Sequence, residues 1–445
     1  MTFNPHTEAD RRAMLRTIGV SSIEELFTPI PEAVRFPNLD LLPPLTEMEA
    51  AARLAELASK SLPASDGNTF LGAGSYNHYI PATVGQILSR GEFYTAYTPY
   101  QPEVAQGTLQ VIYEFQSMVA ALFGMDLANA SMYDGATALA EAVLMSVSAQ
   151  KKRSKVIVSG TVHPAYRGVI HTYSSGLPIE LVDLGIPTDG FVTSVDAITA
   201  QLDDTVATVV VQYPNFFGGI EDITTIAQAA HGVGALLVVA TYPVPLGLLT
   251  PPGELGADIV TAEGQSLGIS QSFGGPYVGL LACRQAFVRL MPGRLSGIAH
   301  DSEGKRGFVL TLQTREQHIR REKATSNICT NQGLMATAAT VYMASVGPEG
   351  FREVANRCYQ NAHYLQRRLC ELPGFELALD APFFHEFVVK TPRSAAEVNA
   401  ALLQAGIIGG YDLSAVESSL DRYLLLCATE LNDKASIDRF IATIS

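Results

Sequence analysis

Short apolar runs alternate with helix-like patterns through the middle of the chain. The runs cover Val156–Ser159, Ile179–Val182, Ala207–Gln212, Ala235–Ala240, Ile259–Ala262 and Val278–Cys283. Helical patterns lie between several of them, at Pro164–Tyr173, Val195–Leu202 and Asp222–His231. Strands that are apolar throughout, rather than at every second position, are typical of a sheet covered by helices on both faces. The pattern therefore predicts an α/β fold around a mostly parallel sheet.

The two ends of the chain follow different patterns. Residues 1–60 predict a helical arm, with a helix at Glu8–Ile18 and then proline-rich connections. The arm packs either on a second subunit or on its own domain, and the sequence favours neither. After a large α/β domain at 61–330, the pattern predicts a small α+β domain at 331–445. Its elements are Gln332–Val346, Arg352–Leu369, Glu386–Lys390, Ala395–Ala405, Tyr423–Ala428 and a helix from Lys434.

The segment from Phe70 to Pro102 is rich in Gly, Tyr, Asn and Pro, and its apolar residues follow neither the helical nor the strand period. It predicts mostly loop, and a long loop inside a compact domain is usually functional or part of an interface. A helix is expected from Glu103, ending at Gly124. Asp134 is the expected N-cap of the next helix, which begins near Ala136.

Composition narrows the class of protein. The 445 residues are 47% hydrophobic and 17% charged, which indicates a large core and an oligomer. The net charge of −14 makes nucleic acid and anionic membranes poor partners. Five scattered cysteines predict neither a disulfide framework nor a metal site, and they suit a reducing cytoplasm. The polar, acidic start predicts no targeting peptide, and no apolar stretch predicts a membrane span.

Four long stretches carry a family resemblance. They are YTAYTPYQPE (94–103), FGMDLANASMYDGATALAEA (123–142), GADIVTAEGQSLGISQSFGGPYVG (256–279) and TREQHIRREKATSNICTNQ (314–332). In this order they closely resemble the N-terminal half of the glycine cleavage P-protein family, which some organisms make as a separate subunit. The resemblance covers nearly the whole chain. It implies the fold-type-I pyridoxal-phosphate transferase fold, with a seven-stranded sheet and a smaller C-terminal domain.

The resemblance also implies a reaction. Enzymes of this family use pyridoxal phosphate to remove CO2 from glycine, and they pass the remaining aminomethyl group to the lipoyl arm of the H-protein. Such an enzyme needs a lysine for the cofactor, an acid against the pyridine nitrogen, and donors for the phosphate.

The residues at those positions depart from this requirement. Gln265 stands at the expected lysine position, and no lysine occurs between Lys155 and Lys305. The strand that should supply the acid ends in Ala240-Thr241-Tyr242, without a carboxylate. Asp134 stands where a helix N-terminus would bind phosphate. Its carboxylate would repel phosphate, and the role of a helix cap is favoured.

These departures imply a subunit that does not anchor the cofactor. By resemblance, pyridoxal phosphate is expected on a homologous partner, subunit 2, with this chain inactive alone and a heterotetramer of two copies of each subunit. The chain is then expected to supply side chains to its partner's site. The candidates are His78, Tyr97, Thr98, Tyr100, Gln101, Thr325, Ser326 and Asn327.

Alternatives remain for these candidates. Each one also suits a packed interface loop with satisfied hydroxyl groups. The basic stretch from Arg315 to Lys323 suits either an anion across the interface or a solvated helix face. Two rival functions stay open as well: a self-sufficient pyridoxal-phosphate enzyme that uses Lys305 or Lys323, and a purely structural or regulatory chain.

Overall fold

The computed structural model describes residues 5–64, 67–324, 328 and 331–445. The chain forms two compact units, Met1–Leu62 and Pro63–Ser445. A further boundary near residue 330 stays a prediction. No helix in the described ranges is long and apolar enough to cross a membrane.

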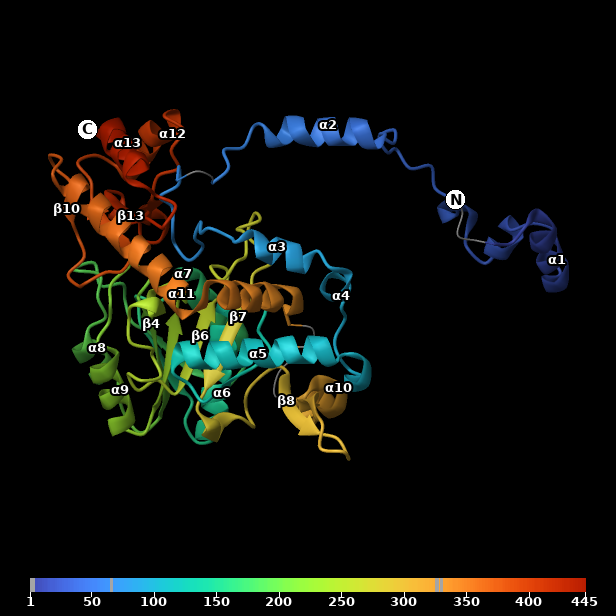
Figure 1. The fold of residues 1–445 in the computed structure, drawn as a ribbon, viewed down its shortest axis with the longest axis horizontal. Helices are drawn as coiled ribbons and strands as arrows, with labels where there is room; N and C mark the ends of the chain where they lie inside the picture. The colour runs from blue at the N-terminus through green and yellow to red at the C-terminus, as the bar shows by residue number, and fades with distance from the viewer. Residues whose placement is uncertain (1–4, 65–66, 325–327, 329–330) are drawn as a thin grey trace. The chain divides into compact units, whose positions relative to one another are not determined.

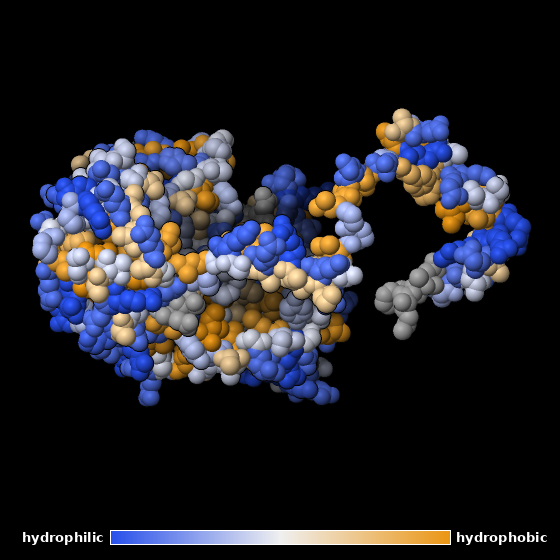
Figure 2. Space-filling model, turned by 90° about the horizontal axis from the view of Figure 1, so that it is seen from above, coloured by the Kyte–Doolittle hydropathy of each residue, from blue (hydrophilic) through white to orange (hydrophobic). Residues whose placement is uncertain are grey.

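The first unit holds helices α1 (Glu8–Ile18) and α2 (Glu47–Ala58). Each begins with a capping box, in which a threonine and an acidic side chain exchange hydrogen bonds with the backbone. Neither helix buries a residue. Apolar side chains therefore lie on the surface of this unit (Figure 2), among them Ile18, Val34, Leu41, Leu42 and Met48. The prediction placed α1 at its observed bounds but missed α2.

The second unit is built on a seven-stranded sheet with the order β1-β7-β6-β5-β4-β2-β3. Figure 1 labels β4, β6 and β7 of this sheet. The strands are β1 (Leu127–Ala128), β2 (Lys155–Val158), β3 (Glu180–Asp183), β4 (Val206–Tyr213), β5 (Leu236–Thr241), β6 (Ile259–Glu263) and β7 (Gly279–Cys283). Five neighbouring strands, from β6 to β3, run parallel, whereas β7 runs antiparallel to β6 and β1. The prediction of a mostly parallel sheet is confirmed.

Helices cover both faces of this sheet, which explains the uniformly apolar strands. One face packs against α6 (Gly135–Gln150) and α7 (Pro164–Ser174). The other packs against α5 (Gln106–Phe123), α9 (Ile223–Gly232) and the first half of α11 (Gly333–Cys370). Successive β5 residues alternate between the faces, since Val238 and Ala240 meet α6 and α7 while Leu237 and Val239 meet α5 and α9. Helix α8 (Val195–Thr199) packs beside α9.

The C-terminal part is a four-stranded antiparallel sheet with the order β10-β11-β13-β12. Its elements are β10 (Glu376–Leu377), β11 (Glu386–Lys390), α12 (Ala395–Gln404), β12 (Tyr411–Asp412), β13 (Tyr423–Cys427) and α13 (Lys434–Ile444). Helix α11 enters this part after a kink at Gly347, whose φ of 60° and ψ of 179° suit glycine. The two helices predicted here are thus the two halves of α11.

The segment Phe70–Pro102 is mostly loop, as predicted, with two short helices in it, α3 (Ala82–Leu88) and α4 (Gly91–Tyr94). Both are too short to show a helical period, and burial of Val84 holds α3 on the core. The hairpin β8 (Leu295–His300) and β9 (Arg306–Thr311) was not predicted. Helix α10 (Gln317–Arg320) follows it within the basic stretch.

Candidate functional site

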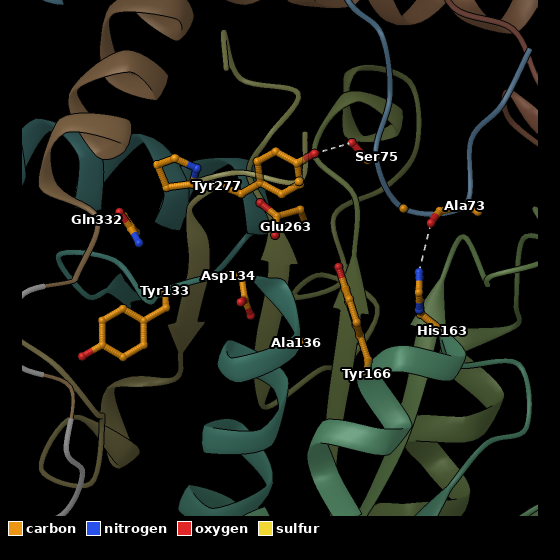
Figure 3. Close-up of a pocket in the computed structure, with 13 residues that line it drawn as sticks. Ala73, Ser75, Tyr133, Asp134, Ala136, His163, Tyr166, Glu263, Tyr277 and Gln332 are labelled. Atoms are coloured by element: carbon orange, nitrogen blue, oxygen red, sulfur yellow. Dashed lines mark hydrogen bonds between the residues drawn. The ribbon is translucent and has the colours of Figure 1, made fainter. Parts of the chain in front are cut away.

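A pocket of about 370 Å³ lies where α6 begins and β6 ends (Figure 3). Its floor is formed by Asp134 and Glu263, and Ala73–Ser75 closes one side. Tyr133, Tyr166 and Tyr277 also line it, together with His163 before α7 and Gln332 before α11. This is the position at which the resemblance places a cofactor, next to the strand that leads to Gln265.

Two carboxyl groups meet the N-terminus of α6. Asp134 is the N-cap, as predicted, and its Oδ1 accepts a hydrogen bond from the Thr137 N–H at 2.8 Å. The Oε2 atom of Glu263 accepts the Gly135 N–H at 2.9 Å. Burial raises the pKa of the Glu263 carboxyl to about 8, and the Asp134 charge adds to that effect, although N–H donors act against it.

Gln265 fixes a neighbouring loop through hydrogen bonds of its side-chain amide. Its side chain is buried, and its amide bonds both the N–H (2.9 Å) and the C=O (3.0 Å) of Tyr76. The same amide nitrogen donates to the Ile269 carbonyl at 2.8 Å. Every polar atom of the side chain is therefore used to fix the Ala73–His78 loop. That loop is also held by Glu386, which accepts the Ala73 N–H at 2.7 Å and the Tyr76 hydroxyl at 2.5 Å.

The residues present do not fit an anchored pyridoxal phosphate. An amide cannot form an imine, and no lysine lines the pocket among the residues that the structure describes. Thr241 ends β5 where an acid would face the pyridine nitrogen, and its hydroxyl donates to the Tyr213 carbonyl instead. Lys305 lies exposed in the turn between β8 and β9, and Lys323 is exposed after α10.

The structure places His78 in the interior, only 7% exposed. Its Nδ1 lies 2.7 Å from Glu430, and its Nε2 pairs with the Tyr242 hydroxyl. Burial opposes ionisation of Glu430, but the charge and hydrogen bond of His78 and the Tyr79 N–H outweigh it, so that the pKa falls to about 2. The geometry therefore describes a buried, hydrogen-bonded His78–Glu430 pair, and a contact of His78 with substrate stays a prediction.

The loop of Tyr97, Thr98, Tyr100 and Gln101 lies on different elements from His78. Tyr97 is 76% and Tyr100 45% exposed, and their ring centres are 6.5 Å apart. The Arg294 guanidinium donates to the Tyr100 hydroxyl at 3.1 Å and lies 5.2 Å from the ring centre. Thr98 is half-buried and Gln101 exposed.

Part of the basic stretch reaches the same surface. His318 packs edge-on against Tyr100 at 6.0 Å, and Glu316 lies 3.5 Å from Arg294 and 3.6 Å from His318. We define Tyr97, Tyr100, Arg294, Glu316 and His318 as the tyrosine–arginine surface. The other predicted residues, Thr325, Ser326 and Asn327, lie outside the described residues.

Several buried carboxyl groups escaped the sequence analysis, among them Glu263, Glu386 and Glu430. The only signal available was an acidic residue inside or directly after an apolar strand, which breaks the pattern of a buried strand. Their partners lie up to 352 residues away in sequence, so the sequence could not pair them.

Ionisation of Glu386 is expected to lower the stability of the fold as the pH rises from 5 to 8. Burial raises the pKa of Glu386 from 4.5 to about 7, because removal from water penalises its charged form. Glu263 shifts in the same direction. The stabilisation is thus complete below the unfolded pKa near 4.5 and is lost as the pH passes the folded values. For Glu386 this loss is roughly 3 kcal/mol.

Chemical unfolding at a series of pH values would measure this slope. The Glu386→Gln variant should have a shallower slope, and Glu376→Gln, an exposed glutamate on β10, should match the wild type. Identical slopes for all three proteins would contradict the assignment to Glu386.

Comparison with known structures identifies the fold. The sphingosine-1-phosphate lyase of Burkholderia pseudomallei aligns with a TM-score of 0.66 at 17% identity, covering 93% of both chains. A crystal structure of glycine decarboxylase (P-protein) of the glycine cleavage system, in inhibitor-bound form, aligns with a TM-score of 0.92 at 44% identity. That alignment covers 100% of this chain and 99% of the other. The fold is that of the fold-type-I pyridoxal-phosphate enzymes.

Sequence comparison narrows this class to one family. The model of the glycine cleavage system P-protein matches residues 1–444. A probable glycine dehydrogenase (decarboxylating) subunit 1 of Thermomicrobium roseum is 57% identical, over 100% of this chain and 99% of that protein. The protein of the same description in Geobacillus kaustophilus is 53% identical over 98% and 97%. The chain belongs to the glycine cleavage system P-protein family.

Proposed function

We propose that this chain is the non-anchoring subunit of a two-subunit glycine decarboxylase. Together with subunit 2 it releases CO2 from glycine and transfers the aminomethyl group to the lipoyl arm of the H-protein. The observation that carries the proposal is Gln265, whose hydrogen-bonded amide stands at the expected lysine position of a chain that matches the P-protein family over residues 1–444. The cofactor chemistry is accordingly assigned to subunit 2.

The tyrosine–arginine surface is the proposed contribution to the partner's site. Glycine is a zwitterion, and hydroxyl, guanidinium and imidazole groups bind its carboxylate by charge-assisted hydrogen bonds. Arg294 is 2% exposed and held beside Glu316, so its position is fixed before a partner binds. Tyr97 and Tyr100, in contrast, present their rings to the outside.

The first unit supports assembly with a partner. Its exposed apolar side chains are not covered by a core of its own. Such surfaces usually mark protein–protein contacts. We assign this unit to contacts within a heterotetramer that contains two copies of each subunit.

Reconstitution tests the proposal. This chain and subunit 2 would be purified separately and assayed for exchange of labelled bicarbonate into glycine with lipoylated H-protein. We expect no exchange from this chain alone and restored exchange on mixing. The Gln265→Lys variant should stay inactive alone, because Thr241 still replaces the acid.

Two results would contradict the proposal. The first is exchange by the isolated chain with added pyridoxal phosphate. The second is a borohydride-trapped adduct at Lys305 or Lys323 that is required for activity, which would favour a self-sufficient enzyme.

A further inference from the structure

The backbone N–H groups at the start of α6 already donate to side chains of this chain. Three N–H groups, those of Gly135, Ala136 and Thr137, precede the first helical hydrogen bond, from the Ala138 N–H to the Asp134 carbonyl at 3.0 Å. Free N–H groups at the start of a helix are a common binding position for phosphate. Here Gly135 and Thr137 donate to the carboxyl groups of Glu263 and Asp134.

Glu263 is fixed in this place from three directions. Besides the Gly135 N–H, its carboxyl group accepts the N–H groups of Gln265 at 3.1 Å and Val278 at 3.3 Å. The residue is 7% exposed. The helix start lies so close to β6 that a Cβ on Gly135 would come within 2.7 Å of the Tyr166 hydroxyl and 2.8 Å of the Glu263 nitrogen. Three backbone N–H groups therefore hold the carboxyl group at the helix start, and the close approach of α6 to β6 keeps it within hydrogen-bond distance of Gly135.

We infer that the Glu263 carboxyl group occupies the phosphate position at the N-terminus of α6 and so closes this pocket to phosphorylated ligands. Loss of covalent anchoring through Gln265 and loss of phosphate binding are then two separate features of the chain. The inference rests on the proposed function only for the choice of ligand. It concerns a site inside this chain, whereas the proposed function concerns the assembled enzyme.

Replacement of Asp134 distinguishes two ways of excluding phosphate, repulsion by a negative charge and occupation of the position by the Glu263 side chain. Serine is also a good N-cap, so Asp134→Ser removes the charge while keeping the helix start. If Glu263 fills the position, that single variant still excludes phosphate. The double variant Asp134→Ser/Glu263→Ser should open the site, because a hydroxymethyl group leaves room and frees the Gly135 N–H.

Binding of 4-deoxypyridoxine 5′-phosphate to the full-length chain tests this inference. The probe lacks the aldehyde, so it forms no adducts with surface lysines. Isothermal titration should detect no saturable binding to the wild type or to Asp134→Ser. The double variant should bind at least tenfold more tightly than Asp134→Ser, and inorganic phosphate should compete. In the same background, Glu263→Gln should not bind, because the amide fills the same volume.

Three outcomes would overturn the inference: saturable binding to the wild type, equal binding to the glutamine and serine variants, or a folded double variant that gains no affinity. Circular dichroism melting would establish folding. If the double variant does not fold, Glu263→Ala in the Asp134→Ser background, which removes both the charge and the volume of the carboxyl group, takes its place with the same expectations. Each of these outcomes leaves the reconstitution result of the two-subunit enzyme unchanged, so the two failures are distinguishable.

Discussion

Replacement of His78 by alanine is expected to lower the free energy of unfolding by about 3–5 kcal/mol. The variant leaves the Glu430 carboxylate buried without its imidazole partner, since the two side chains are only 3% and 9% exposed and lie 2.7 Å apart. It also removes the partner of the Tyr242 hydroxyl. Chemical denaturation at pH 7 measures the loss, which exceeds that of most single substitutions.

An exposed histidine–aspartate pair is the control that shows how much of the loss depends on burial of the pair. His171 pairs with Asp183, but its side chain is 53% exposed, so His171→Ala should cost less than about 1 kcal/mol. Adding Glu430→Gln to His78→Ala should restore part of the stability, because the unpaired charge is gone. Equal losses for His78→Ala and His171→Ala would show that the buried pair carries no special stabilisation.

Replacement of Tyr97 and Tyr100 together by phenylalanine is expected to slow glycine–bicarbonate exchange by the reconstituted enzyme at least tenfold. A hydrogen bond to a charged group contributes about 1.5–3 kcal/mol, which corresponds to roughly 10- to 150-fold in rate or affinity. Both rings and their packing remain, so only the hydroxyl groups are tested. Steady-state kinetics of the two-subunit enzyme, with kcat and KM for glycine resolved, provide the measurement.

The control for this pair is Tyr359→Phe. Tyr359 lies on α11, is 40% exposed, and packs against His363 rather than against the tyrosine–arginine surface. Its replacement should leave exchange unchanged. If the Tyr97/Tyr100 variant also exchanges normally, the scaffold role is favoured. Weaker assembly with unchanged kcat would instead identify the loop as packing at the interface.

Much of the fold follows from local patterns in the sequence. The strand β11 was predicted at its observed bounds, and the parallel strands of the large sheet were predicted within two residues, because residues buried on both faces leave continuous apolar runs. Helix α2 was missed, although Thr46 and Glu49 form a capping box that the sequence displays. The β8–β9 hairpin lacks such a signal, since Gly297 interrupts one strand and its partner is partly exposed.

The candidate site was harder to predict than the fold. Gln265 was recognised because a motif fixes its position, and Thr241 because it follows a predicted strand. The burial of His78 was not, because Glu430 is 352 residues away in sequence. Glu263 was part of a recognised motif, but its hydrogen bond to Gly135 depends on how closely α6 approaches β6. Contacts between distant segments are set by packing, which a single sequence does not display.

The segment that covers the pocket has a consequence for biosynthesis. Its carbonyl groups at Gly67, Thr69 and Asn77 accept hydrogen bonds from Thr429 and Asn432, across separations of 352–365 residues. These bonds form only after nearly the whole polypeptide has left the ribosome, roughly 20–70 seconds after the segment itself at typical rates of translation. The hydrogen bonds of Ala73 and Tyr76 to Glu386 likewise wait for the C-terminal part of the chain. Such long-range contacts slow folding, because the entropy cost of loop closure comes before the contact is gained.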